Sequence, residues 1–558
     1  MAGNARTGGQ ILIDCLVANG VDRAFCVPGE SYLAALDAFH DAPSIDLVVC
    51  RQEGGAAYMA DADGKMTGRP GICFVTRGPG ATNASGGVHV AFQDSTPMIL
   101  FIGQVAREME EREAFQEIDF RRMFGPMAKW VAQIQDPARI PEFVNRAFHT
   151  AMAGRPGPVV LALPEDMLTE RAEAVDLSRA EPAQAHPSPD AMADLRERLT
   201  QAKSPLLVLG GGGWGPKACD DIRHFAEANA LPVAASFRCQ DLIDNAHSNY
   251  AGDVGIGLNP DLKARVLGSD LLMVVGARLG EMTTGGYTMI DIPQPSQPLV
   301  HVHPGAEEIG RVYQPALGIH AAVGAFATAA RALKPVAPNW AGEAEIAHAS
   351  YLKWTEPPTI QGPVQMGEIA AWVRDRVSRD AICTNGAGNF SVWANRYFRY
   401  GGFRTLLGPT SGTMGYGVPA AVAAKARHPE RTVICYAGDG DFLMNGQEFA
   451  TACQYGLPII VLLVNNGMYG TIRMHQEREY PGRISGTALS NPDFAALARA
   501  YGGHGETVRA TDEFEPAFER ALASGLPAVI EILIDPDVIT PATTLSEIRT
   551  AALARSGD

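Results

Sequence analysis

The chain has 558 residues, of which 46% are hydrophobic and 19% are charged, and its formal net charge is -16. This composition is that of an ordinary globular protein and excludes a disordered or fibrous one, and the length predicts about two to four domains. No block of Lys and Arg could neutralise a run of phosphates, so we expect no nucleic-acid partner.

The apolar runs are too short to cross a membrane, so we expect no membrane-spanning segment. The strongest runs, residues 97–102 and 458–464, have the length of core strands, whereas a bilayer span needs about 20 residues. Residues 1–9 lack the basic start and the apolar stretch of a secretory signal, which makes the cytoplasm the expected compartment. The cysteines are scattered without a Cys-x-x-Cys pair, which predicts reduced thiols and neither disulfides nor a zinc site.

Short β-rich runs alternate with Ala-rich helical runs along the whole chain, which is typical of parallel sheets covered by helices on both faces. Two stretches rich in Pro and Ala, near residues 180–189 and 335–363, are expected to link domains. We therefore predict an α/β protein of three doubly wound domains, over residues 1–171, 188–334 and 364–537, followed by a polar tail. The first and third domains share a strand, Gly-rich turn and helix pattern and should contain related sheets.

In the first domain, a carboxylate follows a predicted strand. Residues 45–50 are strand-like, and Glu53 stands at the start of a helix of small residues. The helix dipole favours a carboxylate in a first turn, which is one explanation for Glu53. Its place at a strand end also makes it a candidate site residue.

In the second domain, the strand over residues 206–209 leads into a G-x-G-x-x-G spacing formed by Gly210, Gly212 and Gly215. A helix is predicted to follow, from about residue 217 to 229. This motif is weak evidence when it stands alone. It allows either a dinucleotide at the start of the helix or a purely structural turn.

In the third domain, Gly438-Asp439-Gly440 ends a strand over residues 431–437, and Asn465-Asn466 follows a strand over residues 459–464. We expect residues 438–440 to form a tight turn and residues 446–455 to form a helix. The spacing fits one helix and one return strand. A right-handed crossover would then bring Asp439 and Asn466 to the same edge of a parallel sheet.

That edge is a candidate site for magnesium and a diphosphate. Gly438 and Gly440 would let backbone N–H groups approach a diphosphate, and the Asp439 carboxylate and the Asn466 amide oxygen suit octahedral Mg²⁺. Taken separately, Gly-Asp-Gly and Asn-Asn would be plain turns. Their joint spacing predicts the binding site.

Gly-Asp-Gly followed by Asn-Asn at this spacing resembles the signature of the thiamine-diphosphate-dependent enzymes. Further motifs extend the resemblance to the catalytic subunits of the acetolactate synthases, densely in the first and third domains and more thinly in the second. These motifs are Gly78-Pro79-Gly80-Ala81-Thr82-Asn83, Asp94-Ser95-Thr96-Pro97, Phe115-Gln116-Glu117, Gly154-Arg155-Pro156-Gly157-Pro158 and Ser411-Gly412-Thr413-Met414-Gly415-Tyr416-Gly417.

The resemblance implies thiamine diphosphate and Mg²⁺ as cofactors, with Asp439, Asn466 and the Met468 carbonyl as metal ligands. It implies that Glu53 bonds the aminopyrimidine ring and promotes the imino tautomer that forms the reactive ylid, while the cofactor does the carbanion chemistry. The other residues that it places at the cofactor are Pro79, Asn389, Gly412, Met414, Gly438, Gly440 and Asp441.

By the same resemblance, Met414 is an apolar wedge between the two cofactor rings, the Gly412 carbonyl receives the aminopyrimidine N–H, and Asn389 helps to hold the diphosphate. Met414 could instead be core filler, although the glycines around it isolate its side chain. In the family each active site lies between two chains, which implies a homodimer or homotetramer.

The sequence also departs from the synthases. His475 stands nine residues after Asn466, where the synthases carry a tryptophan that selects the larger acceptor, and Glu165 replaces a lysine. Glu30 stands where the pyruvate-decarboxylase branch places an aspartate and the synthases have a small residue. Gln116, in contrast, matches the synthases and differs from the paired histidines of the decarboxylases. The candidate catalytic residues are Glu53, Gln116, Glu30 and His475.

We expect His475 on a loop, where a solvated histidine is the alternative explanation. Arg473 and Arg478 nearby could supply charge for an anionic substrate or be only surface residues of a mobile loop.

FAD is the third cofactor that the resemblance raises. In the synthases a Gly-rich turn in the middle domain, the Arg155 region and an Arg-Phe-Asp-Asp-Arg stretch touch FAD. Gly276-Ala277-Arg278-Leu279-Gly280-Glu281 stands in place of the last of these and retains one arginine. Bound FAD and a purely structural domain are therefore both open.

The resemblance implies a carboligase that decarboxylates a 2-oxo acid and adds the remaining unit to a second carbonyl compound, a 2-oxo acid or an aldehyde. One alternative is a decarboxylase that releases an aldehyde, with Glu30 or His475 as the acid. Acyl-CoA lyases and flavin oxidases of the same superfamily are further alternatives. A non-catalytic cofactor sensor is an alternative of a different class.

Overall fold

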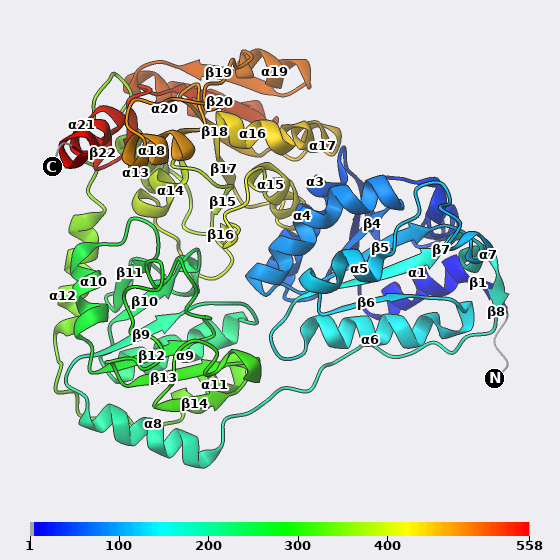
Figure 1. The fold of residues 1–558 in the computed structure, drawn as a ribbon, viewed down its shortest axis with the longest axis horizontal. Helices are drawn as coiled ribbons and strands as arrows, with labels where there is room; N and C mark the ends of the chain where they lie inside the picture. The colour runs from blue at the N-terminus through cyan, green and yellow to red at the C-terminus, as the bar shows by residue number, and fades with distance from the viewer. Residues whose placement is uncertain (1–4, 557–558) are drawn as a thin grey trace. The chain divides into compact units, whose positions relative to one another are not determined.

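The computed structural model describes residues 5–556, so part of the N-terminal stretch that bears on the expected compartment lies outside it. By its internal packing the chain divides into two compact units, unit 1 up to Gln184 and unit 2 from Ala185 onward. Unit 1 contains one six-stranded sheet and unit 2 contains two, each flanked by helices (Figure 1). The predicted α/β class with three parallel sheets is confirmed, whereas the limits given for the three domains stay predictions.

The sheet of unit 1 is parallel throughout, in the order β3-β2-β4-β5-β7-β6. Its strands are β2 (Arg23–Cys26), β3 (Asp46–Val49), β4 (Gly71–Val75), β5 (Met98–Gln104), β6 (Trp130–Gln133) and β7 (Pro158–Pro164). Its helices are α1 (Gly8–Ala18), α2 (Leu33–His40), α3 (Glu53–Thr67), α4 (Gly78–Asp94), α5 (Phe120–Phe124), α6 (Ile140–Met152) and α7 (Glu165–Thr169). A short antiparallel pair, β1 (Arg6–Thr7) with β8 (Arg171–Ala172), joins the two ends of the unit.

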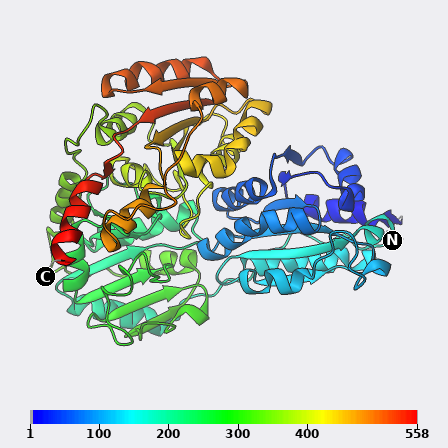
Figure 2. The ribbon, with the colours of Figure 1, turned by 45° about the horizontal axis from the view of Figure 1, so that its top comes forward.

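The sequence explains this packing directly. Every residue of β5 is buried, because a central parallel strand is covered on both faces and needs an almost continuous apolar run. The helices α3 and α4 lie side by side (Figure 2) and are built from small residues that let their backbones come close. If residue 87 had a side chain, its Cβ would lie only 2.3 Å from the Cβ of Ala57, so glycine is needed at this contact between the two helices.

The first sheet of unit 2 has the order β11-β10-β9-β12-β13-β14. Its strands are β9 (Pro205–Leu209), β10 (Val233–Ser236), β11 (Tyr250–Val254), β12 (Leu271–Val275), β13 (Leu299–His303) and β14 (Leu317–His320), and its helices are α8 (Pro189–Gln201), α9 (Pro216–Ala228), α10 (Pro260–Gly268) and α11 (Val323–Arg331). Counted in chain order within the sheet, the strands run 3-2-1-4-5-6, an order typical of dinucleotide-binding folds.

The second sheet of unit 2 has the order β16-β15-β17-β18-β20-β19. Its strands are β15 (Ile382–Asn385), β16 (Leu406–Leu407), β17 (Val433–Gly438), β18 (Ile460–Asn465), β19 (His504–Val508) and β20 (Ala528–Leu533). Its helices are α13 (Met366–Arg376), α14 (Ser391–Tyr397), α15 (Gly417–Arg427), α16 (Asp439–Asn445), α17 (Phe449–Gln454), α18 (Gly470–Glu479), α19 (Phe494–Ala500) and α20 (Phe514–Ser524). Counted in chain order, this sheet and the sheet of unit 1 both run 2-1-3-4-6-5, which confirms the expected kinship of the two.

Two segments predicted to be irregular contain regular structure. The expected linker over residues 335–363 includes α12 (Glu343–Trp354), which packs against β11. The expected polar tail forms β21 (Val538–Thr540), β22 (Thr543–Thr544) and α21 (Leu545–Ser556). Arg549 of α21 donates to both carboxylate oxygens of Glu477 on α18, at 2.8 and 2.6 Å, and this long-range ion pair fixes the C-terminal helix on the protein.

Two further features concern the cysteines and the length of the helices. All nine cysteines are free thiols. Among the helices of residues 5–556, none is long and apolar enough to cross a membrane.

Candidate active site

Glu53 begins α3 at the carboxyl edge of the sheet of unit 1, as the sequence predicts. Its Oε2 accepts a hydrogen bond from Asn83 Nδ2 at 2.9 Å, so the carboxylate is oriented by α4. A Cβ on Gly80 would lie only 3.3 Å from Glu53 Oε1. The half-buried carboxylate therefore lies directly against the first turn of α4, where the Gly-Pro-Gly motif stands.

Gln116 is held next to the same turn. Its carbonyl oxygen accepts the Gly78 N–H at 2.9 Å, and its backbone is left-handed, with φ of 66°. A Cβ on Gly78 would lie 2.7 Å from that carbonyl oxygen, so glycine is needed at this close approach. Pro79 follows in the first turn of α4 and is exposed. The structure thus brings together three residues that the sequence singled out, Glu53, Pro79 and Gln116.

Glu30 and Glu165, the two acidic departures from the synthases in this part of the chain, both contact an arginine that the sequence analysis missed. Arg77 Nη2 lies 3.2 Å from Glu30 Oε1 and 3.8 Å from Glu165 Oε2. Arg77 is buried at the N-terminal end of α4. The signal that could have found it is an arginine between a buried strand and the Gly-Pro-Gly turn.

In unit 2, Asp439 is the first residue of α16 and follows β17 directly. The expected tight turn over residues 438–440 is wrong, because the helix starts at the aspartate. The helix expected over residues 446–455 is split into a 3₁₀ turn at Gly446–Glu448 and α17. Because α16 starts at Asp439, the carboxylate lies at the positive end of the helix dipole. That end of a helix favours negative charge, including the phosphate groups of a ligand.

The Asp439 carboxylate collects hydrogen bonds from three neutral donors. Oδ1 accepts from Gly440 N at 2.9 Å, and Oδ2 accepts from Gly467 N at 2.9 Å and from Asn491 Nδ2 at 2.7 Å. The side chain is buried, and burial raises its pKa. A buried carboxylate whose hydrogen-bond partners are all neutral is an environment that a bound cation would stabilise.

The two asparagines after β18 have different environments. Asn465 Oδ1 shares the Gly467 N–H and the Asn491 amide with Asp439, at 3.0 Å each. Asn466 Oδ1 instead accepts from Met468 N at 3.2 Å, within its own turn. Asn491 was missed because it lies in the irregular segment before α19.

The donor set fits magnesium. Asp439 offers a carboxylate, Asn466 an amide oxygen and Met468 a backbone carbonyl, and all three are hard oxygen donors. No cluster of three His, Cys, Asp or Glu side chains that could hold a metal occurs in residues 5–556. A site with one carboxylate matches Mg²⁺, which completes its shell with phosphate oxygens and water, better than it matches a transition metal.

Replacing Asn491 with alanine should weaken magnesium-dependent binding of thiamine diphosphate by about 10- to 100-fold, the usual effect of removing a residue that orients a metal ligand. The variant loses the amide that bonds both Asp439 and Asn465. Calorimetric titration of the cofactor in the presence of Mg²⁺ measures the change. Ser490→Ala, at the exposed neighbouring position, is the control, and equal affinities in the two variants would contradict this role.

Asp441 joins two loops of the same edge. Its Oδ1 accepts from Ala387 N, after β15, at 3.1 Å and from Gly415 N, before α15, at 2.9 Å. Burial raises the pKa of this carboxyl to about 7. The predicted cofactor residue Asp441 therefore also fixes the loop that carries Met414.

Met414 is half-buried, next to Gly415. Gly412 and Gly415 have left-handed backbones, with φ of 67° and 77°. Asn389 is bonded to α18, since its Oδ1 accepts from Thr471 Oγ1 at 2.9 Å and its N–H donates to the same hydroxyl at 3.0 Å. These residues lie on the loops that follow β15 and precede α15.

The expectation that His475 lies on a loop is wrong. His475 is on α18, between Gly470 and Glu479, and is exposed. Arg473, two residues earlier, is buried and forms an ion pair with Glu477, so it is neither a surface residue nor placed to bind an anion. Arg549 pairs with Glu477 of this helix across 72 positions, a contact that local sequence does not reveal.

The start of the Gly-rich turn after β9 packs closely against Ser236 and Gly276. A Cβ on Gly210 would lie 2.0 Å from Ser236 Oγ, and one on Gly211, at φ of 71°, would lie 2.0 Å from the Gly276 carbonyl oxygen. The buried indole of Trp214 donates to the Gly210 carbonyl at 2.8 Å. Gly210 and Gly211 therefore allow two turns to pack together, which gives the first motif glycine a structural explanation, whereas a Cβ on Gly215 would meet nothing within 4 Å.

Arg155 forms hydrogen bonds within unit 1. Its Nε donates to Ser95 Oγ at 2.9 Å, and its Nη2 donates to the Phe92 carbonyl at 2.7 Å. The arginine thereby fixes the C-terminal end of α4, which explains its presence without a flavin.

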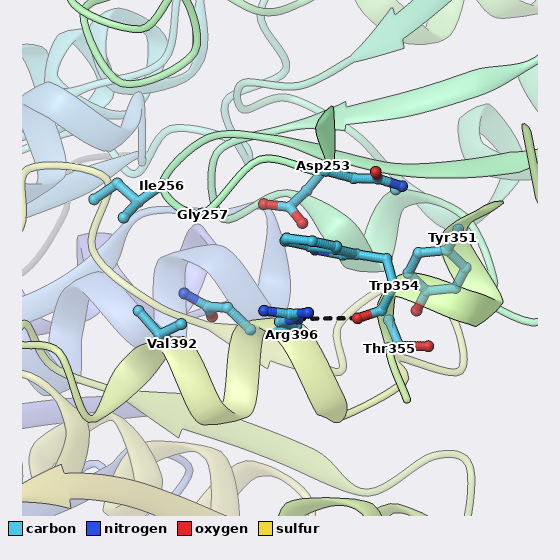
Figure 3. Close-up of a pocket in the computed structure, with 11 residues that line it drawn as sticks. Asp253, Ile256, Gly257, Tyr351, Trp354, Thr355, Val392 and Arg396 are labelled. Atoms are coloured by element: carbon cyan, nitrogen blue, oxygen red, sulfur yellow. Dashed lines mark hydrogen bonds between the residues drawn. The ribbon is translucent and has the colours of Figure 1, made fainter. Parts of the chain in front are cut away.

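A small pocket in unit 2 is lined by none of the predicted site residues. Figure 3 shows Asp253 and Trp354 facing each other across it, with Arg396 on the other side of the indole. The Arg396 Cζ is 3.6 Å from the centre of the Trp354 ring, and its Nε donates to the Trp354 carbonyl at 2.9 Å. Burial raises the pKa of Asp253 to about 7. The indole and guanidinium stack fills this junction of α12, α14 and the end of β11.

Comparison with known proteins gives consistent matches along the chain. Three family models match in order: the N-terminal TPP binding domain of thiamine pyrophosphate enzymes over residues 6–123, their central domain over residues 192–330, and their C-terminal TPP binding domain over residues 386–532. Similar proteins include the acetolactate synthase large subunit of Parasynechococcus marenigrum, 34% identical over 94% of this chain and 87% of the relative. Another is the acetolactate synthase isozyme 2 large subunit of Escherichia coli, 30% identical over 95% of each chain.

Proposed function

The chain belongs to the thiamine pyrophosphate enzyme family, and from that premise we propose that it is a carboligase that removes carbon dioxide from a 2-oxo acid and joins the remaining unit to a second carbonyl compound. The observation that carries the proposal is the buried Asp439 carboxylate, held by neutral donors at the carboxyl ends of β17 and β18. The resemblance to acetolactate synthase large subunits supports the choice of reaction.

Different residues of the chain would bind the metal, receive the diphosphate and exchange the proton. Asp439, Asn466 and the Met468 carbonyl would hold Mg²⁺, and the glycines on either side of Asp439 would let the diphosphate approach the backbone. Thiamine diphosphate (thiamine pyrophosphate), when bound, supplies the carbon nucleophile and the electron sink. Glu53 would exchange a proton between its carboxylate and a ring nitrogen of the aminopyrimidine, in the orientation that Asn83 gives it.

Other residues would support the site. Met414 would contact the cofactor from its half-buried position on the loop that Asp441 fixes. Asn389 and the Gly412 carbonyl are further contacts implied by the family. Gln116 stands beside the Gly78 turn, near Glu53. His475 is exposed on α18 and would act only on a substrate that reaches that helix.

We further propose a homodimer or homotetramer, in which unit 1 of one copy supplies Glu53 to a cofactor held by Asp439 of another copy. The family resemblance supports this arrangement. For the central domain we propose a structural role without FAD, because Gly210 and Gly211 pack against neighbouring turns. Arg155 of unit 1 is held at the end of α4 by its own hydrogen bonds.

A second candidate reaction is decarboxylation followed by release of an aldehyde. Glu30 favours it, because this carboxylate is largely exposed at the carboxyl edge of the sheet and is held there by Arg77. A carboxyl group in this position, after taking a proton from solvent, could deliver that proton to the carbon that has lost carbon dioxide.

The proposal is tested with protein stripped of cofactor and supplied with thiamine diphosphate and Mg²⁺. A series of 2-oxo acids, acyl-CoA thioesters and aldehydes is offered, and carbon dioxide and products are measured. We expect carbon dioxide from at least one 2-oxo acid only when both cofactors are present, together with a product of carbon–carbon bond formation. An aldehyde as the sole product would select the second candidate, and turnover of the thioesters alone would contradict both.

A further inference from the structure

Three charged side chains from different strand ends meet in unit 1. Glu30 follows β2 and begins a 3₁₀ turn (Glu30–Tyr32), Arg77 lies between β4 and α4, and Glu165 begins α7 after β7. One nitrogen, Arg77 Nη2, is 3.2 Å from Glu30 and 3.8 Å from Glu165. We call these residues the Arg77 cluster. Two carboxylates for one guanidinium leave it with a formal charge of about -1.

The members of the Arg77 cluster are unequally exposed. The side chain of Arg77 is 8% exposed, whereas those of Glu30 and Glu165 are 66% and 35% exposed. The buried Arg77 Nε has no hydrogen-bond partner among the described residues. The exposed ring of Phe115 has its centre 6.0 Å from Arg77 Cζ. A ligand arriving at this edge therefore meets carboxylates and a phenyl ring before it meets the cation.

The cluster borders the turn that contacts Glu53. A Cβ on Gly29, beside Glu30, would lie 2.5 Å from the Thr76 Cβ. A Cβ on Gly80 would lie 2.9 Å from Thr76 Cγ2 and 3.3 Å from Glu53 Oε1. Thr76 thus packs between the Glu30 segment and the turn that holds Glu53, so the cluster and the proposed proton-transfer residue share one end of the sheet.

We propose that the Arg77 cluster sets the class of the acceptor, favouring an uncharged carbonyl compound such as an aldehyde over a second 2-oxo acid. This inference rests on the proposed carboligase function. The carboxylate of a 2-oxo acid would approach the exposed Glu30 carboxylate and the half-buried Glu165 carboxylate, while the single guanidinium is buried and faces both of them through Nη2. Like charges a few ångströms apart repel one another, and selectivity can rest on repulsion of the wrong ligand.

The reaction balances without a further reagent. The bond between C1 and C2 of the donor acid breaks, and C1 leaves as carbon dioxide. The electron pair left on C2 forms the new bond to the acceptor's carbonyl carbon, and the acceptor's oxygen takes a proton from solvent. The donor's carboxylate is lost in this sequence, so only the acceptor's charge distinguishes the two outcomes.

The test uses ¹³C-labelled pyruvate as donor and a matched pair of acceptors at equal concentration. Propanal and 2-oxobutanoate differ only by the carboxylate, and NMR distinguishes the labelled products, 3-hydroxypentan-2-one and 2-aceto-2-hydroxybutanoate. For the wild type we expect the aldehyde product in excess by roughly tenfold or more. Because the readout is a ratio of products, a lower overall rate does not affect it.

Glu165→Lys changes the formal charge of the cluster from about -1 to about +1 and should shift the product ratio toward the acid by at least about tenfold. Glu165→Gln should fall between this variant and the wild type. Glu173→Lys, which makes the same change at an exposed position after β8, is the matched control and should keep the wild-type ratio. A wild-type preference for 2-oxobutanoate, or equal ratios in the two lysine variants, would overturn the proposal.

A second readout needs no turnover. Saturation-transfer NMR compares binding of the unreactive pair propanoate and propanamide, and we expect propanamide to bind better to the wild type and propanoate to gain in Glu165→Lys. No difference between the variants would count against the cluster's role. Absence of carbon dioxide from every 2-oxo acid would instead contradict the proposed function, so the two failures are distinguishable.

Discussion

Replacing Glu53 with glutamine should lower turnover by about 100- to 10,000-fold, the range expected when a general acid or base is lost. Glutamine has nearly the shape of glutamate and can still accept the Asn83 hydrogen bond that orients residue 53 at the start of α3. An amide does not take up and release a proton near neutral pH. The loss should therefore be in catalysis, while the cofactor still binds.

Two measurements separate these effects. Carbon dioxide release reports turnover, and calorimetric titration reports binding of thiamine diphosphate with Mg²⁺. Glu173→Gln makes the same substitution at an exposed position and should behave as the wild type. A Glu53→Gln enzyme that retains turnover within about threefold of wild type would remove Glu53 from the mechanism.

Replacing Asp439 with asparagine should weaken binding of thiamine diphosphate and Mg²⁺ by at least about 100-fold. The variant loses the carboxylate of the proposed metal site, and breaking a buried charge pair costs about 3–5 kcal/mol. Three N–H donors now point at the two carboxylate oxygens. An asparagine side chain offers one acceptor oxygen and one NH₂ group, so at least one of these donors would face another donor.

Cofactor titration with and without Mg²⁺ measures the effect of Asp439→Asn. Asp512→Asn, on an exposed 3₁₀ turn of the same unit, is the matched control. Unchanged affinity in Asp439→Asn would place the metal elsewhere. Wild-type affinity that does not depend on Mg²⁺ would mean that the metal takes no part in binding the cofactor.

The sequence predicted the fold well where local pattern decides the structure. A central parallel strand such as β5 must be apolar throughout, and Gly-rich turns mark the strand ends, so the order of strands and helices can be read from the chain. For the same reason Glu53 and Asp439 were found at the carboxyl edges of their sheets, whereas Pro79 and Gln116 were singled out by the family resemblance. Local pattern also indicated the kinship of two sheets, which share one strand order.

The residues that were missed depend on partners far away in the sequence. Arg77 is separated from Glu30 by 47 positions and Asn491 from Asp439 by 52, and no short motif links either pair. The ion pair of Arg549 with Glu477 links α21 to α18 across 72 positions. Such contacts form only after the sheets have brought the strand ends together, so composition and spacing do not show them.

The central claim is that Glu53 activates thiamine diphosphate on this protein. Its most direct test is the exchange for deuterium of the hydrogen on the thiazolium carbon between nitrogen and sulfur, followed by NMR after rapid quenching with acid. This measurement requires no knowledge of the substrate. The account predicts exchange at least about 100-fold faster on the wild-type enzyme than in free cofactor, and a rate close to that of free cofactor in Glu53→Gln. Wild-type enzyme that binds the cofactor but exchanges this hydrogen no faster than solution would contradict it.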